Sequence, residues 1–303
     1  PRSAPRTSSA RSSPTEHPTT PPRPPPGRST THEEDPGHRR GRRPRASLTA
    51  CSSGDGGAAS GDKIKIGIKF DQPGLGLKTG DTYAGFDVDV ATYIAGKLGK
   101  QPNQIEWVQT PSAQREDMIA NGNVNFIVAT YSITDSRKEK VSFAGPYLIA
   151  GQDLLVRSDE NSITGIDSLN GKKLCSVKGS TSASNVKAKV PGVQLQEFGT
   201  YSECVAALVA KGVDALTTDD SILAGYAAQD QYKGKVKLVG APFSKENYGV
   251  GLKKGDTALC NQITDALKAM VADGSWQKAL DKNLTPAGYK PQAGNPPTPA
   301  PCA

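Results

Sequence analysis

The stretch ATYSITDSRKEKVSFAGPY, residues 129–147, decides the fold of this chain. It begins as the end of an apolar run, NFIVAT at 125–130, which predicts a buried strand. The side chains then become polar, with Thr130, Ser132 and Thr134 followed by Arg137. Three hydroxyls and a guanidinium at the end of a strand predict a place that receives an anionic group.

Strand and helix patterns alternate from residue 62 onward. Such alternation favours open α/β sheets, and 303 residues are enough for two domains of ordinary size. In these sheets ligands lie beyond the carboxyl ends of strands, where the polar stretch is expected. Asp87 and Ser112 are the expected N-caps of helices at 85–99 and 112–119. Further strands are expected at 63–68, 152–157, 172–177, 193–198, 213–218, 235–240 and 248–255, and further helices from 202 and at 259–271.

The net charge of +7 comes almost entirely from the N-terminal region. Residues 1–50 hold ten arginines and four acidic residues, whereas the remainder has 27 Lys and Arg against 26 Asp and Glu. A nucleic-acid surface needs clustered basic residues on the folded body, so nucleic acid is not an expected partner. All three histidines precede residue 51, which removes Ser-His-Asp and Cys-His chemistry and most zinc sites from the body. We therefore expect no metal and no cofactor.

Residues 1–50 are rich in Pro, Arg, Ser and Thr, and they predict a disordered tail or an altered signal region. Leu-Thr-Ala-Cys at 48–51 looks like a bacterial lipobox, in which Cys51 is the lipidated residue. The apolar segment that precedes such a site is missing, so a free cysteine in a disordered arm is the other interpretation. Residues 51–61 then predict a flexible lipoprotein tether.

Several motifs, taken together, resemble one family. They are GFDVDVATYIAGKLG (85–99), ATYSITDSRKEKVSFAGPY (129–147), VDALTTDDSILAGY (213–226), YGVGLKKGD (248–256) and DGSWQKALDKNL (273–284). With these motifs the chain is similar to the extracellular solute-binding proteins of family 3, which are the polar-amino-acid receptors of ABC importers, and most of all to glutamate-binding lipoproteins of actinobacterial importers. The resemblance implies a two-lobed, periplasmic-binding-protein-like α/β fold of type II, with two open sheets joined by two crossover strands. It places the first lobe at 62–155 and 246–290, the second at 156–245, and a Pro-rich tail at 291–303.

The resemblance also implies roles for single residues. Arg137 matches the arginine that holds the ligand α-carboxylate, a role that suits a planar fork of donors that keeps its charge on burial. Ser132 matches a hydroxyl donor to the same carboxylate, and Thr130 lends backbone near the ligand amino group. Asp219 matches the acid that receives the ligand ammonium. The second-lobe loop that closes over the carboxylate is matched by Lys178, Thr181 and Ser182, although many relatives have Gly at 180 and 182.

Two further cations bear on which amino acid is bound. Lys69 ends the first strand, where relatives with other ligands place an acidic or neutral residue, and a cation there suits a side-chain carboxylate. Arg115 is a second candidate, for which a structural role is equally open. With Arg137 on the α-carboxylate, these charges favour an acidic amino acid: glutamate first, aspartate second, glutamine or asparagine third.

Four cysteines remain besides Cys51, and four cysteines allow three pairings. The implied fold puts Cys175 and Cys204 in one lobe, and an oxidising location outside the cell favours a disulfide between them. Cys260 opens a C-terminal helix and Cys302 ends the Pro-rich tail. A bond between these two would pin the tail to the first lobe, and two free thiols are the alternative.

The expected function is capture without chemistry. An amino acid enters an open cleft, the lobes close on it, and the closed form docks on the importer's permease. We expect an extracytoplasmic monomer, attached to the outer face of the cell membrane through a lipid anchor. Two other classes stay open. The fold also hosts dehydratases, which need a general acid or base in the cleft, and some such domains act as amino-acid sensors.

Overall fold

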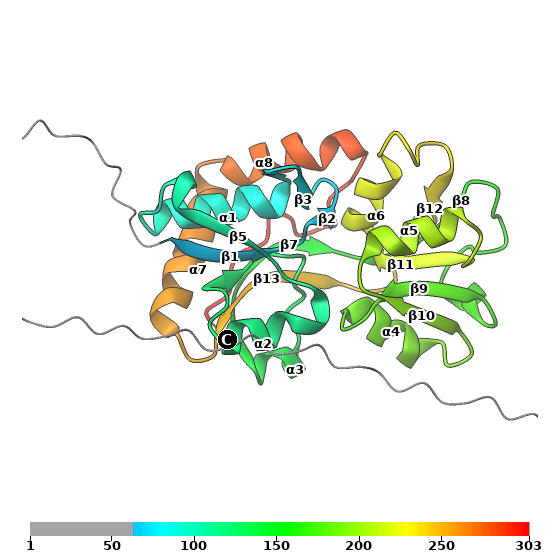
Figure 1. The fold of residues 1–303 in the computed structure, drawn as a ribbon, viewed down its shortest axis with the longest axis horizontal. Coiled ribbons are helices and arrows are strands. Elements are labelled where there is room, and N and C mark those ends of the chain that lie inside the picture. The colour runs from blue at the N-terminus through cyan, green and yellow to red at the C-terminus, as the bar shows by residue number, and fades with distance from the viewer. Residues whose placement is uncertain (1–62, 303) are drawn as a thin grey trace, which may run out of the picture. The chain divides into compact units, whose positions relative to one another are not determined.

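Residues 63–302 are described by the computed structural model, and they form two α/β lobes (Figure 1). The sheet of the first lobe is mixed: β1 runs parallel to its two neighbours, whereas β13 runs antiparallel to β6 and β7. In spatial order this sheet contains β5 (Ile105–Gln109), β1 (Ile64–Ile68), β6 (Phe126–Ile127), β13 (Glu246–Lys253) and β7 (Val141–Ala150).

The sheet of the second lobe repeats the pattern. Here β8 is the strand that runs antiparallel to its neighbours, and β9 pairs in parallel on both sides. In spatial order this sheet contains β10 (Gln194–Phe198), β9 (Lys173–Val177), β11 (Ala215–Asp219), β8 (Gln152–Arg157) and β12 (Val236–Leu238).

In each sheet the fourth strand, β13 in the first lobe and β8 in the second, adjoins a crossover between the lobes and runs antiparallel to both of its neighbours. This is the two-lobed type II arrangement that the resemblance implies. The chain passes from β7 to β8 at Gly151 and returns to the first lobe between β12 and β13. All of β8 lies in the second sheet. The first crossover therefore falls at residue 151, whereas the sequence predicted a lobe boundary after residue 155.

Helices cover both faces of each sheet (Figure 1). In the first lobe they are α1 (Phe86–Lys97), α2 (Arg115–Ala120), α3 (Asp135–Lys138), α7 (Thr257–Ala272) and α8 (Ser275–Asn283), with short 3₁₀ turns at 102–104, 112–114 and 285–287. In the second lobe they are α4 (Thr181–Lys189), α5 (Tyr201–Val209) and α6 (Asp220–Ala227), with a 3₁₀ turn at 166–169. A small antiparallel sheet at the edge of the first lobe contains β2 (Asp71–Gln72), β3 (Gly76–Thr79) and β4 (Thr82–Ala84). None of the helices within residues 63–302 has the length and apolar character that crossing a membrane requires.

The start of α1 shows why the expected cap is wrong. Gly85, and not Asp87, occupies the N-cap position, and its φ of 130° lies in the region that favours glycine. A Cβ at Gly85 would lie 2.0 Å from the carbonyl oxygen of Leu75, so no side chain fits there. The helix then turns Phe86, Val90 and Ile94 into the core, and Asp87 is fully buried inside the lobe.

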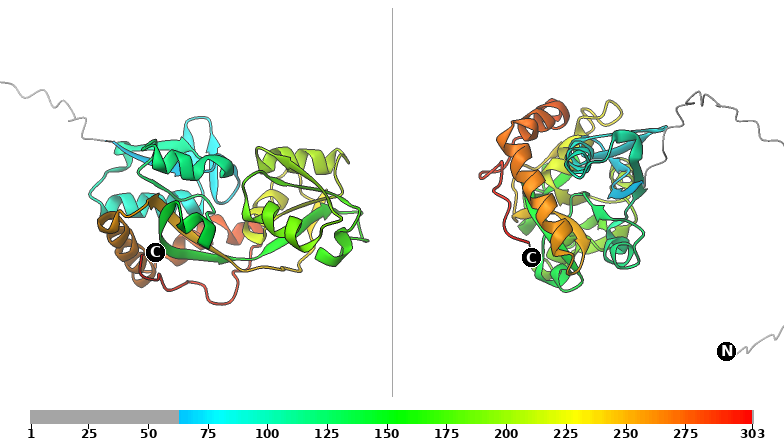
Figure 2. Two further views of the ribbon diagram at one scale, coloured as in Figure 1. Left: turned by 90° about the horizontal axis from the view of Figure 1, so that it is seen from below. Right: turned by 90° about the vertical axis from the view of Figure 1, so that its left-hand side faces the viewer.

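The last residues of the described chain run back along the first lobe toward α7 (Figure 2). Asn295 both accepts from the backbone N–H of Ile149 (2.9 Å) and donates to its carbonyl (2.8 Å), and Ala300 bridges to Gly145 of β7. A disulfide from Cys302 to Cys260 of α7 ends the segment. The Pro-rich segment from 291 to 302 is thus packed against the edge strand of the sheet.

A second disulfide, Cys175–Cys204, joins β9 to α5 across 29 residues of sequence. Both sulfurs are buried, and the bond restricts the unfolded chain as well as bracing α5.

Replacing both cysteines by Ala should lower the free energy of unfolding by about 3 kcal/mol, because a loop of this length loses its constraint in the unfolded state. Denaturant unfolding of the oxidised protein and the double variant tests this. An unchanged midpoint and slope contradict it.

Candidate functional site

The candidate site lies between the lobes, where the segments after β6, β9 and β11 face one another. The inner cavity is small, with a volume of ≈ 10 Å³ that holds about one water molecule, so a larger solute enters only after the lobes move apart. A wider outer cavity of ≈ 600 Å³ shares Arg137, Ser180 and Thr181 with it and forms its mouth. The inner cavity is lined by Ser112, Arg115, Thr130, Arg137, Ser180, Thr181, Ser182, Tyr201, Asp219 and Ile222.

Arg137 is held from both lobes. It lies on the short helix α3, whose N-cap Thr134 accepts a hydrogen bond from the Arg137 backbone N–H at 3.3 Å. The guanidinium donates to the carbonyl of Ser132 (2.8 Å) and, across the cleft, to the carbonyl of Gly179 (3.1 Å). Its Nε lies 3.4 Å from a carboxylate oxygen of Glu116. The Arg137 side chain is only 10% exposed, so its guanidinium presents a fixed positive charge at the cavity wall.

Asp219 supplies the opposite charge from the second lobe. It ends β11 at the N-cap position of α6 but makes no capping hydrogen bond there. One oxygen, Oδ2, accepts from the Tyr248 hydroxyl at 2.6 Å. The other, Oδ1, is buried and has no hydrogen-bond partner among residues 63–302. Burial, and then the nearby charge of Glu246, raises the pKa of Asp219 well above its usual value.

Thr130 is fixed by a carboxylate that does not reach the cavity. NFIVAT leaves the sheet after two residues, and Thr130 takes a φ of 47° that few side chains adopt. Its backbone N–H donates to Asp87 Oδ2 at 2.9 Å, and the Tyr147 hydroxyl donates to Asp87 Oδ1 at 2.8 Å. Asp87 thus stabilises the unusual backbone at Thr130 instead of capping a helix. Its burial raises its pKa to about 6.

Lys69 and Arg115 converge on one hydroxyl. Lys69 Nζ donates to Ser112 Oγ at 2.9 Å, and Arg115 Nη2 donates to the same oxygen. Ser112 therefore binds two cations and does not cap the following helix, contrary to the expectation from the sequence. Lys69 is 4% exposed and lies behind Ser112, so it reaches the cavity through that hydroxyl. Burial, with Arg115 second, lowers the pKa of Lys69 well below its usual value.

The second-lobe loop brings two of its three expected residues to the cavity. Ser180 caps α4 by accepting from the backbone N–H of Ala183 at 3.0 Å, which turns Thr181 and Ser182 inward. The hydroxyls of Thr181 and Ser132 lie 3.3 Å apart across the cleft. Lys178, in contrast, is exposed and lines the outer cavity.

Five residues of the site were not singled out as ligand contacts from the sequence: Ser112, Ser180, Tyr201, Ile222 and Tyr248. Tyr201 has a partial signal, because Thr200 and Glu203 form the capping box that starts α5 and so place Tyr201 at its first position. The signal does not say that this position faces the cleft. Within the described residues, no three His, Cys, Asp or Glu side chains gather closely enough to hold a metal ion.

Comparison with known proteins identifies close relatives. Residues 64–286 match the family model of bacterial extracellular solute-binding proteins, family 3. The glutamate-binding protein GluB of Corynebacterium efficiens is 47% identical over 265 residues, covering 82% of this chain and 90% of the relative. The glutamine-binding protein GlnH of a Bacillus subtilis ABC transporter is 37% identical over 252 residues, covering 78% and 91%. Among solved structures, an ancestral arginine-binding protein bound to arginine has a TM-score of 0.68 and 34% identity, covering 73% of this chain and 97% of that one.

The buried Asp87 should leave a mark on stability. Because its pKa rises from 3.8 to about 6 on folding, the folded protein holds a proton that the unfolded chain releases. The resulting stabilisation is fully present below about pH 4 and is lost as the pH rises through about 6. The free energy of unfolding should thus fall by on the order of 2–3 kcal/mol relative to Asp87→Asn over this window. Urea unfolding of both proteins at several pH values measures the difference, and parallel stability curves would contradict it.

Proposed function

The chain belongs to the bacterial extracellular solute-binding proteins of family 3, and we propose that it captures a free acidic amino acid, glutamate before aspartate, for the permease of an ABC importer. Two relatives support the class of ligand, since one is named for glutamate and another for glutamine. The choice between these two side chains rests on the residues of this chain.

The single observation that carries the proposal is the unpaired Oδ1 of Asp219 opposite Arg137. A buried carboxylate oxygen without a partner costs free energy unless a cation meets it. A buried guanidinium on the facing lobe similarly favours an anion. A solute that carries an ammonium and a carboxylate on the same carbon, as an α-amino acid does, satisfies both. The α-carboxylate lies against Arg137, Ser132 and Thr181, and the ammonium against Asp219 and the backbone of Thr130.

The remaining part of the ligand is assigned to the cations around Ser112. Lys69 and Arg115 are almost fully buried, and the hydroxyl that both of them contact is neutral. Asp71 and Asp87 act on Lys69, but neither lines the inner cavity. A side-chain carboxylate would add a negative charge within the cavity itself, whereas an amide would not. Glutamine or asparagine is the alternative ligand, in which the amide oxygen accepts from the same two cations.

The setting of the receptor is also a proposal. The protein works outside the cytoplasm as a monomer, with the permease as its partner and without a catalytic step. Cys51 carries a lipid that anchors it to the outer face of the cell membrane, and residues 51–61 form the tether. Cys51 and this tether lie outside the described residues.

Calorimetric titration of the protein with each standard amino acid tests the ligand class. Glutamate should bind most tightly, with aspartate weaker and the amides weaker still. Binding of a basic or apolar amino acid in place of glutamate would contradict the acidic ligand. No binding by any amino acid would overturn the proposed function.

Removing the guanidinium should weaken capture strongly. Arg137→Ala leaves a ligand carboxylate buried without its partner, at a cost of about 2–5 kcal/mol. The glutamate dissociation constant should rise by roughly 30-fold to several thousand-fold. Lys138→Ala is the matched control, because Lys138 lies next in sequence, is far more exposed and, among residues 63–302, forms its one ion pair with Asp135 in the same helix. Equal affinities in the two variants would remove Arg137 from the site.

Neutralising Lys69 should change selectivity more than overall binding. Lys69→Met keeps a long buried side chain but removes the cation, so glutamate should lose about tenfold or more in affinity while glutamine loses little. Titration of both amino acids into both proteins gives the ratio. An equal loss for the two ligands would show that Lys69 supports the fold of the pocket without reading the side chain.

A further inference from the structure

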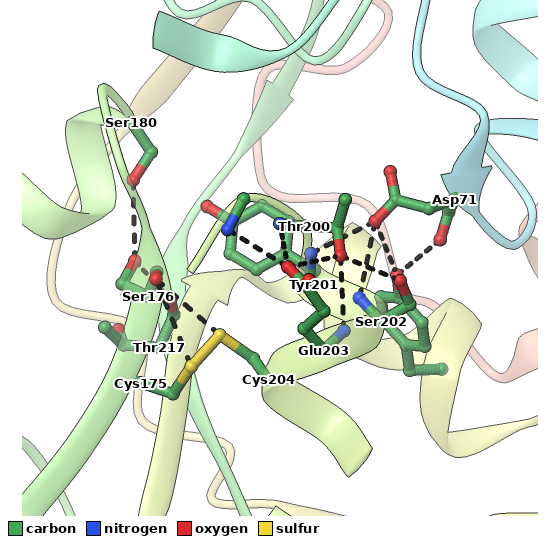
Figure 3. The surroundings of a disulfide bond; sticks show 12 residues. Asp71, Cys175, Ser176, Ser180, Thr200, Tyr201, Ser202, Glu203, Cys204 and Thr217 are labelled. Carbon is green, nitrogen blue, oxygen red and sulfur yellow. Dashed lines mark hydrogen bonds between the residues drawn. A yellow bond between two sulfur atoms is a disulfide. The ribbon is translucent and has the colours of Figure 1, made fainter. Parts of the chain in front are cut away.

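A loop of the first lobe docks on a helix of the second, away from the strands that connect the lobes. Asp71 of β2 accepts hydrogen bonds through Oδ2 from the backbone N–H groups of Tyr201 (3.0 Å) and Ser202 (3.3 Å), the first two residues of α5 (Figure 3). The Tyr226 hydroxyl of α6 donates to the same oxygen at 3.1 Å and also to the Asp71 carbonyl. One carboxylate of the first lobe therefore meets three donors of the second.

These donors are the ones that the helix itself leaves unpaired. The first N–H groups of a helix have no partner inside it, and the helix dipole favours negative charge at this end. Thr200 satisfies the N–H of Glu203 within the second lobe, and Glu203 in return accepts from Thr200. The N–H groups of Tyr201 and Ser202 are met by Asp71, which belongs to the other lobe.

The helix that Asp71 contacts is braced and faces the cavity. The Cys175–Cys204 disulfide ties α5 to β9, so α5 moves with its lobe (Figure 3). Tyr201, whose N–H Asp71 accepts, is 3% exposed and its side chain lines the inner cavity. The position of Tyr201 over a bound solute therefore depends on how the two lobes meet at Asp71.

The neighbouring contact is equally close. Gly225 of α6 packs against Pro73, two residues beyond Asp71, and a Cβ at Gly225 would lie 2.0 Å from the Pro73 carbonyl oxygen. Its φ is not in the left-handed region, so backbone conformation does not call for glycine here. Glycine is required at position 225 because the two lobes approach each other closely there.

We propose that Asp71 is a positioning residue for ligand capture, which acts through α5 and Tyr201 by holding the lobes closed at the rim of the cleft. The contact forms when the lobes close and is absent when they are open. This rests on the proposed function, because closure matters only if a solute is held between the lobes. Asp71 does not touch the solute.

Asp71→Ala should therefore weaken glutamate binding about tenfold, mainly through faster dissociation, since the variant's closed form has lost charge-assisted hydrogen bonds. Asp71→Asn, which keeps an acceptor but loses the charge, should recover part of the loss. The melting temperature of the ligand-free protein should not change, because the open form lacks the contact. Asp71 is also one of the charges that act on Lys69, and losing a negative charge there favours an anionic ligand. Weaker binding thus points to the lost contact.

Asp256→Ala is the matched control. Asp256 is the N-cap of α7 and accepts from the Leu259 N–H at 3.1 Å, entirely within the first lobe. Its loss should lower the melting temperature of the ligand-free protein by about 2–4 °C and leave glutamate affinity unchanged. If Asp71→Ala behaves like this control, Asp71 has a structural role only and the proposal is overturned.

Gly225→Ala tests the same contact between the lobes, but it should raise the melting temperature of the ligand-free protein, whereas the Asp256→Ala control should lower it. Alanine favours a helix interior over glycine, so the ligand-free protein should melt about 1–3 °C higher. Glutamate affinity should nevertheless fall about tenfold or more, because the new methyl group blocks the approach of Pro73. Unchanged affinity would show that the lobes do not need to meet here, and would overturn the proposal.

Energy transfer between a dye on each lobe separates this proposal from the proposed function. The ligand-free protein should spend a smaller fraction of time closed in Asp71→Ala and in Gly225→Ala than in the unmodified protein. This readout needs no ligand, so it tests Asp71 even if no amino acid binds. Equal closed fractions in all three proteins would refute the contact as a closing device.

Discussion

A carboxylate oxygen buried between two lobes, without a partner, is the constraint on which the rest of this site depends. Asp219 uses one oxygen to accept from Tyr248, and the described structure offers the other no donor. Such an arrangement opposes closure until a cation arrives. Arg137 on the facing wall is in a different state, because it already donates to the carbonyls of Ser132 and Gly179 and lies beside Glu116. Under the proposed function, Asp219 and Arg137 together favour a zwitterion over a singly charged solute of similar size.

One residue of a connecting strand ties these two ends together. Tyr248 lies on β13, which links the lobes, and it forms an isolated bridge with Ser132 as well as the hydrogen bond to Asp219. The backbone carbonyl of Ser132 in turn holds Arg137. Tyr248 and Ser132 therefore help to set the distance between Arg137 and Asp219. They do so near the hinge, where opening of the lobes moves atoms least. Under the proposed function, the head group of the ligand is recognised there, and the cations around Ser112 distinguish its side chain.

The sequence predicted the parts of this arrangement that depend on local pattern. Alternating elements predicted open α/β sheets, and the hydroxyl-rich end of one strand together with Arg137 predicted a place for an anionic group. The two-lobed topology and the expected ligand roles of Arg137 and Asp219 came from the resemblance to the family. The sequence did not predict residues whose role depends on a partner far along the chain. Asp87 looks like a helix cap until its pairing with Thr130, 43 positions away, is known.

Misplaced and missed residues have the same cause. Lys178 follows its motif in sequence, but the capping of α4 by Ser180 turns the next two residues inward and leaves Lys178 at the mouth. The capping box of Thr200 and Glu203 predicts that a helix starts at Tyr201. That Tyr201 lines the inner cavity follows only from how the two lobes pack. Local rules fix the direction of a chain, and only tertiary contacts decide which side chain meets the ligand.

Closure of the lobes has to be favourable with ligand and unfavourable without it. Contacts between the lobes favour closure, and buried charges in the cleft oppose it. Three contacts between the lobes stabilise the closed form regardless of ligand. They join Arg137 to Gly179, Ser132 to Thr181, and Asp71 to the start of α5. Burying Asp219 and Lys69 destabilises it, because the loss of water outweighs the opposite charges that act on them, which are Arg137 for Asp219 and Asp71 and Asp87 for Lys69. A ligand shifts the population only by its difference in affinity for the two forms. Under the proposed function, an acidic amino acid supplies opposite charge both at Asp219 and at the cations around Ser112, whereas its amide supplies opposite charge at Asp219 alone and only a neutral acceptor at the cations.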